Sequence, residues 1–112
     1  MAFDAALEMA HGIAKITLSG ELDANGAPTF KSEVEKAAAE QPKRLVLLMQ
    51  DLEYMASAGL RILIFAKQKM GTDVDIYVVG AQEPVMETLQ LSGFHQSVIA
   101  LDTYDAAEIE NI

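Results

Sequence analysis

The chain has 112 residues and no cysteine, which excludes disulfide frameworks, thiol nucleophiles and zinc–thiolate sites. Its 17 acidic residues outnumber its 8 basic residues and give a net charge of −9, which disfavours binding to nucleic-acid phosphates and to anionic membranes. Residues 1–20 lack a basic leader, and no apolar run approaches the roughly 20 residues of a membrane span. We therefore expect one domain over residues 1–112, in the cytoplasm, whose charge serves solubility or attraction to a basic protein.

Two strands are expected at the start of the chain. Residues 2–9 alternate between apolar and polar types, with Phe3 and Leu7 on the apolar side, and residues 13–19 resume the alternation. The break between them contains His11. This pattern predicts an antiparallel hairpin with His11 as a turn residue.

A loop and a helix follow the second strand. Gly20-Glu21-Leu22-Asp23 ends the strand, and Pro28 opens a helical pattern that stops before Pro42. Its apolar side comprises Phe30, Val34, Ala37 and Ala38. Asp23 has two interpretations, as a loop carboxylate that caps backbone N–H groups or as a functional carboxylate.

Residues 44–70 form the stretch around which the chain is organised. Residues 45–49 are a short apolar run that ends at Gln50-Asp51 and predicts a strand buried on both faces. Residues 60–70 have the pattern of a helix with little solvent-facing surface. Between them lie four small residues, Ala56-Ser57-Ala58-Gly59. A hydroxyl at this point is exposed on a rigid frame, beside the partly positive start of a helix.

The remaining residues predict two more strands and two more helices. Residues 73–79 and 97–101 are the strands. Pro84 opens a helix that ends at Gly93, and Thr103 is the expected N-cap of a helix over residues 104–110. The apolar residues expected toward the sheet are Val85, Met86, Leu89 and Leu91. The succession of strands and helices predicts an α/β fold with a mixed, largely parallel sheet of about five strands, an N-terminal hairpin strand and about four α-helices.

Catalytic motifs are scarce, so we expect no enzyme and no cofactor. The segment around Ser57, MASAG, lacks the first glycine of the G-x-S-x-G elbow, and neither His11 nor His95 suggests a triad. The glycines form no dinucleotide loop, and GxxxxGK[ST] is absent.

Ser57 has two interpretations on physical grounds. Its oxygen can cap the following helix by accepting a backbone N–H, which contributes about 1 kcal/mol. Alternatively, it accepts a phosphate at a helix N-terminus. Nearby, Tyr54 is either a packed ring or a surface residue, and Met55 is either core or part of an adaptable contact surface.

Four segments together resemble the STAS domain, the module of sulphate-transporter tails and anti-sigma factor antagonists. They are Gly20-Glu21-Leu22-Asp23, LVLLMQDLEYMASAGLRILI, Val79-Gly80 and VMETLQLSGF. The chain is more similar to the free-standing bacterial antagonists than to transporter tails. The resemblance implies a STAS-like fold and a partner switch. In that family, the antagonist binds an anti-sigma factor that is also a serine kinase with a histidine-kinase-like ATPase fold, and a metal-dependent serine phosphatase reverses the phosphorylation.

The resemblance also implies which residues act. The family's turn most often reads Asp-Ser-Ser/Thr-Gly-Leu, and the usual acceptor falls on Ala58, which has no hydroxyl. The variant Ser-Ser-Ala-Gly-Leu-Arg matches residues 57–61 better and leaves Ser57 as the expected phosphorylation site. Asp23 matches a loop aspartate near the acceptor, and Arg61 faces the partner, the phosphate or solvent. The expected partner-binding residues are Glu21, Asp23, Tyr54, Met55, Ala56, Ala58, Gly59 and Arg61.

Three alternatives stay open at this point. The missing hydroxyl at Ala58 allows a constitutive antagonist or a STAS scaffold with no phosphorylation cycle. A nucleotide- or lipid-binding module is a weaker alternative because no phosphate-cradling glycine loop is present. Direct catalysis is the weakest alternative, because the sequence shows no motif for a general base or a metal site.

Overall fold

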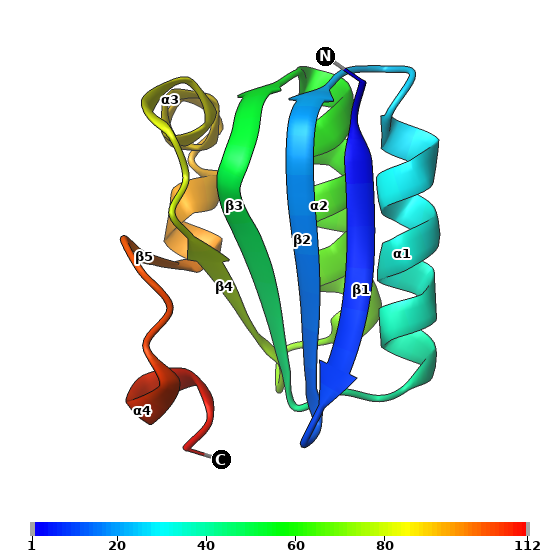
Figure 1. Ribbon diagram of the computed structural model, residues 1–112, viewed down its shortest axis with the longest axis vertical. Helices are drawn as coiled ribbons and strands as arrows, with labels where there is room; N and C mark the ends of the chain where they lie inside the picture. Colours follow the sequence, from blue (N-terminus) through cyan, green and yellow to red (C-terminus); the bar gives the residue numbers. More distant parts are fainter. Residues whose placement is uncertain (1, 112) are drawn as a thin grey trace.

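Five strands form one mixed sheet in the order β1-β2-β3-β4-β5 (Figure 1). The computed structural model describes residues 2–111. The strands are β1 (Asp4–Ala10), β2 (Ile13–Leu22), β3 (Arg44–Met55), β4 (Asp75–Val79) and β5 (Ile99–Leu101). The helices are α1 (Ala27–Ala39), α2 (Ser57–Met70), α3 (Glu83–Ser92) and α4 (Ala106–Ile109), with a 3₁₀ turn, η1 (Phe94–Ser97). β1 and β2 pair antiparallel, and the other described strand pairs are parallel, so the predicted α/β fold with an N-terminal hairpin strand is confirmed.

The β1–β2 hairpin is closed by two residues with left-handed backbone angles. His11 has a φ of 54° and Gly12 a φ of 80°, between the paired residues Ala10 and Ile13. Positive φ at both central residues matches the right-handed twist of the strands. His11 is therefore a turn residue, as predicted.

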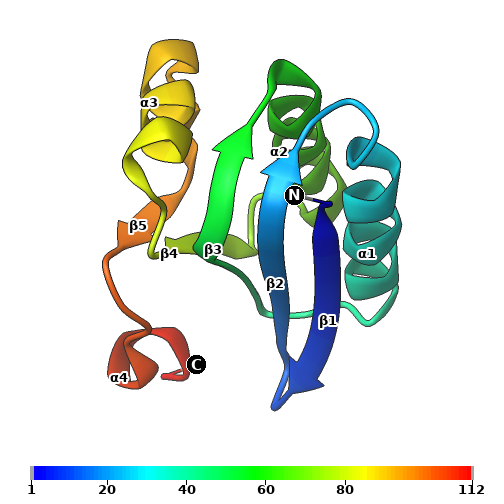
Figure 2. The ribbon, with the colours of Figure 1, turned by 45° about the horizontal axis from the view of Figure 1, so that its top comes forward.

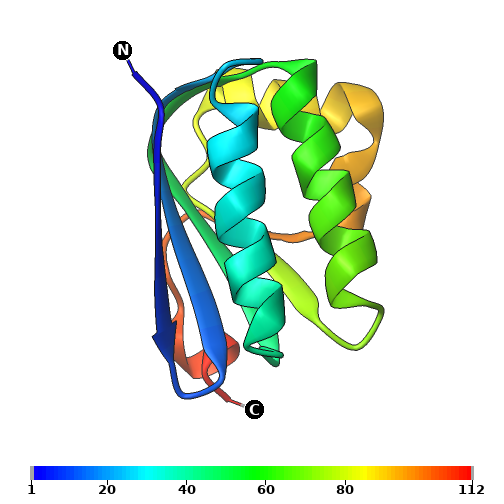
Figure 3. The same cartoon turned by 90° about the vertical axis from the view of Figure 1, so that its right-hand side faces the viewer.

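Helices α1 and α2 lie side by side on one face of the sheet (Figure 3). Phe30 of α1 and Leu63 of α2 are fully buried in one cluster with strand residues such as Leu18 and Leu47. On the opposite face, Ile109 of α4 completes a second, smaller apolar cluster. One face of the sheet is thus covered by α1 and α2, whereas α4 covers only one end of the other face, and exposed residues such as Thr17 and Glu53 lie on the strands beyond it.

Strands β2 and β3 extend further than the sequence pattern indicated. β3 continues to Met55 instead of ending near Met49. The register between β2 and β3 shifts between Thr17 and Ser19 and again between Gly20 and Glu21, and β3 carries the extra residue each time. These bulges give buried β3 residues a spacing of three, at Met49, Leu52 and Met55. The predicted strand was too short because this spacing imitates a helical period.

Other local predictions were wrong near the C-terminus. Leu91 was expected toward the sheet, but it is 83% exposed. The N-cap of α4 is Asp105, not Thr103, and its carboxylate accepts the Glu108 N–H at 3.2 Å. The left-handed residue after α3 is Gly93, with a φ of 79°, as expected. These differences reflect where each helix packs, which the local pattern does not encode.

Candidate functional site

The candidate site is the turn between β3 and α2. Ala56 is the N-cap residue, with extended backbone angles, and α2 begins at Ser57. The Ala56 N–H donates to the Leu22 carbonyl at 2.8 Å, and the Ala56 carbonyl accepts the N–H groups of Gly59 (2.9 Å) and Leu60 (3.2 Å). The turn is therefore joined to the end of β2 on one side and to the first turn of α2 on the other.

Small residues allow α2 to approach β2 closely at this turn. A Cβ atom placed on Gly59 would lie 2.6 Å from Cγ of Leu22 and 2.9 Å from Cγ of Met55. At such distances a larger residue fits only if Leu22 or Met55 shifts, so glycine is the residue that fits here without rearrangement. The close contact fixes the start of α2, and with it the position of Ser57.

The side chain of Ser57 is exposed at the first position of α2. Within residues 2–111, no side-chain hydrogen bond caps this helix, and the N-cap position belongs to Ala56. The interpretation of Ser57 as the N-cap is therefore wrong. Its hydroxyl is open to solvent and lies beside backbone N–H groups of the first helical turn.

One face of α2 presents Ser57, Arg61 and Ile64 to solvent. Residues four and seven positions apart lie on the same side of a helix, and a side chain points toward the N-terminal end. Arg61 is therefore the cationic neighbour of Ser57. Ile64 is 40% exposed, although it lies in the segment 60–70 that was expected to have little solvent-facing surface. Its seven-residue spacing from Ser57 was the signal for a shared exposed face.

Asp23 caps the loop between β2 and α1. Its Oδ1 accepts the N–H groups of Asn25 and Gly26, both at 3.0 Å. The capping interpretation is thus confirmed, and the carboxylate remains exposed. On the adjacent strands, Glu21 is paired with Tyr54 in the β2–β3 register, and Tyr54 is 48% exposed.

The other expected contact residues lie deeper. Met55 is 1% exposed and Gly59 is buried, so neither presents a side chain to a partner in this conformation. The expectation of a surface contact from Met55 is wrong; its side chain packs in the core below the turn. Ala56 and Ala58 are half-buried at the turn itself.

The end of the sheet that carries the turn is acidic. Strand register places the start of β1 beside the end of β2, and the end of β2 beside the end of β3 (Figures 1 and 2). We call the exposed carboxylates there the acidic end; they are Asp4, Glu21, Asp23, Asp51 and Glu53. The electrostatic potential of such a cluster is negative, which favours nearby cations and disfavours anions.

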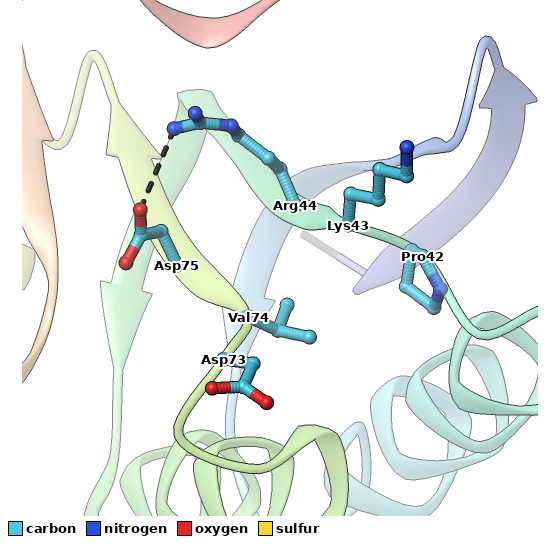
Figure 4. A pocket seen from close by; sticks show the side chains of 6 residues that line it. All are labelled: Pro42, Lys43, Arg44, Asp73, Val74 and Asp75. Atoms are coloured by element: carbon cyan, nitrogen blue, oxygen red, sulfur yellow. Dashed lines mark hydrogen bonds and ion pairs between the residues drawn. The ribbon is translucent and has the colours of Figure 1, made fainter. Parts of the chain in front are cut away.

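One hollow, of about 280 Å³, adjoins the acidic end and is lined by residues that include Glu21 and Asp23. Another hollow, of about 340 Å³, lies at the amino ends of β3 and β4, where Arg44 pairs with Asp75 at 3.4 Å (Figure 4). Near α4, a hydrogen bond with Tyr104 is the main reason that the pKa of Lys15 is raised, and burial raises the pKa of Tyr77 and Tyr104.

Metal-binding clusters and membrane-spanning helices are absent from the described residues. In residues 2–111, no three His, Cys, Asp or Glu side chains converge to hold a metal ion. None of the helices described combines the length and apolar character that a membrane crossing requires.

Comparisons with known proteins agree on one family. The STAS domain family model matches residues 4–108. The anti-sigma-F factor antagonist RsfB of Mycobacterium tuberculosis is 26% identical over 87 residues, which cover 78% of this chain and 71% of RsfB. An anti-sigma factor antagonist from Mycobacterium paratuberculosis superposes with a TM-score of 0.88 at 23% identity, covering 98% of this chain and 96% of that one.

The fold is also similar to that of SpoIIAA, solved in two forms. The unphosphorylated form superposes with a TM-score of 0.78 at 18% identity, covering 97% of this chain and 94% of SpoIIAA. The phosphorylated form, from Bacillus, gives a TM-score of 0.70 at 18% identity, with 97% of both chains covered. The family model matches this chain over nearly its whole length, from residue 4 to residue 108. The chain therefore belongs to the STAS domain family.

Proposed function

We propose that this protein is an anti-sigma factor antagonist that acts by partner switching. Its unphosphorylated form binds an anti-sigma factor, which is also a serine kinase with a histidine-kinase-like ATPase fold, and so releases a sigma factor. Residues 1–112 form a single STAS domain that acts in the cytoplasm, without catalysis and without direct contact to nucleic acid or membrane. The names of the relatives, RsfB among them, support this role.

The observation that carries the proposal is the exposed hydroxyl of Ser57 on a rigid turn. Gly59 packs against Leu22 and fixes the start of α2, so the hydroxyl is presented with little conformational freedom. A kinase gains from such a preordered acceptor because less entropy is lost in reaching the reactive geometry. Ser57 is the phosphorylation site in this proposal.

The proposed contact surface surrounds Ser57. It consists of exposed or half-buried residues of three neighbouring segments: Glu21, Asp23, Tyr54, Ala56, Ala58 and Arg61. The small side chains of Ala56 and Ala58 allow a partner to approach the backbone, and the half-exposed ring of Tyr54 supplies apolar contact area. The acidic end selects a partner with a basic surface.

Phosphorylation then acts by charge. A phosphate on Ser57 adds about −1.5 to −2 charges at neutral pH next to the acidic end. Repulsion and desolvation oppose docking of the partner, and no change of fold is needed. A metal-dependent serine phosphatase restores the binding form.

Intact-mass spectrometry of the protein from its native cells tests the switch. We expect a population heavier by one phosphate in the wild type and none in Ser57→Ala. A phosphate that persists in Ser57→Ala would refute Ser57 as the acceptor. Immobilised wild-type protein should also retain an anti-sigma factor, identified by mass spectrometry, and release it when ATP is added.

A second candidate is a constitutive antagonist or scaffold without a phosphorylation cycle. The observation that favours it is Ala58, which stands where the family usually has the accepting hydroxyl. In that case the protein stays unmodified under growth and stress, and the partner complex is unaffected by ATP.

A further inference from the structure

Strand β3 extends beyond its neighbour β4. Among residues 2–111, β4 pairs with β3 only from Arg44 to Leu48, so the later part of β3 has β2 on one side and no described strand on the other. Helix α3 lies along that free side (Figures 1 and 2). A strand edge without a partner leaves backbone groups that other donors must satisfy.

Two side chains of the α3 segment donate to β3 carbonyls. Gln82 Nε2 donates to the Gln50 carbonyl at 2.8 Å, and Thr88 Oγ1 lies 3.3 Å from the Met55 carbonyl. The Thr88 hydroxyl is also 3.2 Å from the Pro84 carbonyl within α3, so one proton is shared between two acceptors. These side-chain donors bind β3 carbonyls that would otherwise accept backbone N–H groups from a neighbouring strand.

The Met55 carbonyl is the last of β3 and directly precedes the turn that carries Ser57. On the β2 side, the Ala56 N–H donates to the Leu22 carbonyl. Thr88 acts on the same turn from the α3 side. The turn is thus hydrogen-bonded on both sides: to a backbone carbonyl of β2 on one side and to the hydroxyl of Thr88 on the other.

We propose that Thr88 is a positioning residue for Ser57. Its hydroxyl holds the Met55 carbonyl and limits the motion of the turn, which keeps the Ser57 hydroxyl in the geometry that the kinase uses. This inference rests on the proposed function, because it concerns how that site is ordered. Sequence patterns gave no sign of it, since Thr88 and Met55 are 33 positions apart.

Three variants test the role of the Thr88 hydroxyl. Thr88→Val removes it and keeps the branched shape, and Thr88→Ser restores it. Gln82→Leu is the matched control, because it deletes the other hydrogen bond between the α3 segment and β3 at Gln50, away from the turn. A merely structural tie between α3 and β3 would make Thr88→Val and Gln82→Leu behave alike.

Amide hydrogen exchange by NMR is the first measurement. The N–H groups of Gly59 and Leu60, which donate to Ala56, should exchange about three- to tenfold faster in Thr88→Val, as expected for loss of one hydrogen bond. Thr88→Ser and Gln82→Leu should match the wild type. Equal acceleration in Thr88→Val and Gln82→Leu, or none in Thr88→Val, would overturn the proposal.

Phosphorylation of Ser57 by the anti-sigma factor kinase captured with the wild type is the second measurement. Its initial rate should fall by about the same three- to tenfold in Thr88→Val and recover in Thr88→Ser. An unchanged rate in Thr88→Val would refute the positioning role. If the kinase leaves the wild type unmodified, the proposed function fails, while the exchange measurement still decides whether Thr88 orders the turn.

Discussion

The start of α2 packs so closely on the end of β2 that a Cβ atom added to Gly59 would lie 2.6 Å from Cγ of Leu22. The two elements leave no room for a methyl group at this position. This contact links the turn to the core, because Leu22 is fully buried. Any larger residue at position 59 must displace α2 or the side chains of Leu22 and Met55.

Gly59→Ala should therefore destabilise the fold, although alanine normally favours helices. We expect the free energy of unfolding in urea to fall by about 1–3 kcal/mol, the usual cost of overpacking. Adding Leu22→Ala creates space for the methyl group, so the two changes together should cost less than their sum. Additive effects in this double-mutant cycle would contradict the proposed clash.

Ile109 should contribute most of the stability that α4 provides. It is fully buried against Ile13, Val46 and Tyr77 on the outer face of the sheet, although α4 has only 4 residues. We expect Ile109→Ala to lower the free energy of unfolding by about 2–4 kcal/mol and to increase binding of a hydrophobic dye. Leu91→Ala, at a position that is 83% exposed, is the control and should leave both unchanged.

Stability should fall at alkaline pH because of the groups around α4. The pKa of Lys15 is raised above its ordinary value of 10.5, chiefly by its hydrogen bond with Tyr104. The contribution of Lys15 to the free energy of unfolding is thus fully present below about pH 10.5 and is lost as the pH rises through the folded-state pKa. Burial raises the pKa of Tyr77 and Tyr104 above 10.0, which adds to the loss in the same direction.

The free energy of unfolding should then decrease between about pH 10 and pH 12, measured by urea denaturation. Tyr104→Phe should make this decrease shallower, because it removes one titrating group and the hydroxyl that raises the pKa of Lys15. Tyr54→Phe, at an exposed position, is the matched control. An equally steep decrease in Tyr104→Phe would show that other groups dominate.

Charge at the acidic end should govern the rate at which the anti-sigma factor associates. Glu21→Lys replaces a carboxylate beside Tyr54 with a cation, and we expect the association rate constant to fall by about tenfold at low ionic strength. The difference should shrink near about 0.5 M salt, because salt screens exposed charges. Surface plasmon resonance measures both effects.

The control for that experiment makes the same charge change elsewhere. Glu40 is exposed just after α1, at the opposite end of the helix from the β2–α1 loop. Glu40→Lys should have a much smaller effect on association. If both variants slow association equally, net charge and not the acidic end attracts the partner.

Local sequence patterns by themselves determined much of this protein. Two-residue alternation specified β1 and most of β2, and the break in that alternation at His11 indicated their tight turn, because the side-chain period of a strand is two. The Pro28 and Pro84 positions and Gly93 marked helix ends for the same local reason. The small-residue segment that contains Ser57 was likewise visible as a strand-to-helix junction.

Only the tertiary structure decided how that junction is built. The length of β3 depends on pairing with β2 through two bulges, and the N-cap passes to Ala56 because the Leu22 carbonyl takes its N–H. Tertiary contacts also decide which side chains are buried. Met55 and Ile109 are buried because other elements pack against them, whereas Leu91 has no such cover and is exposed. Such contacts join residues far apart in the chain, as Thr88 and Met55 are, and a local period carries no information about them.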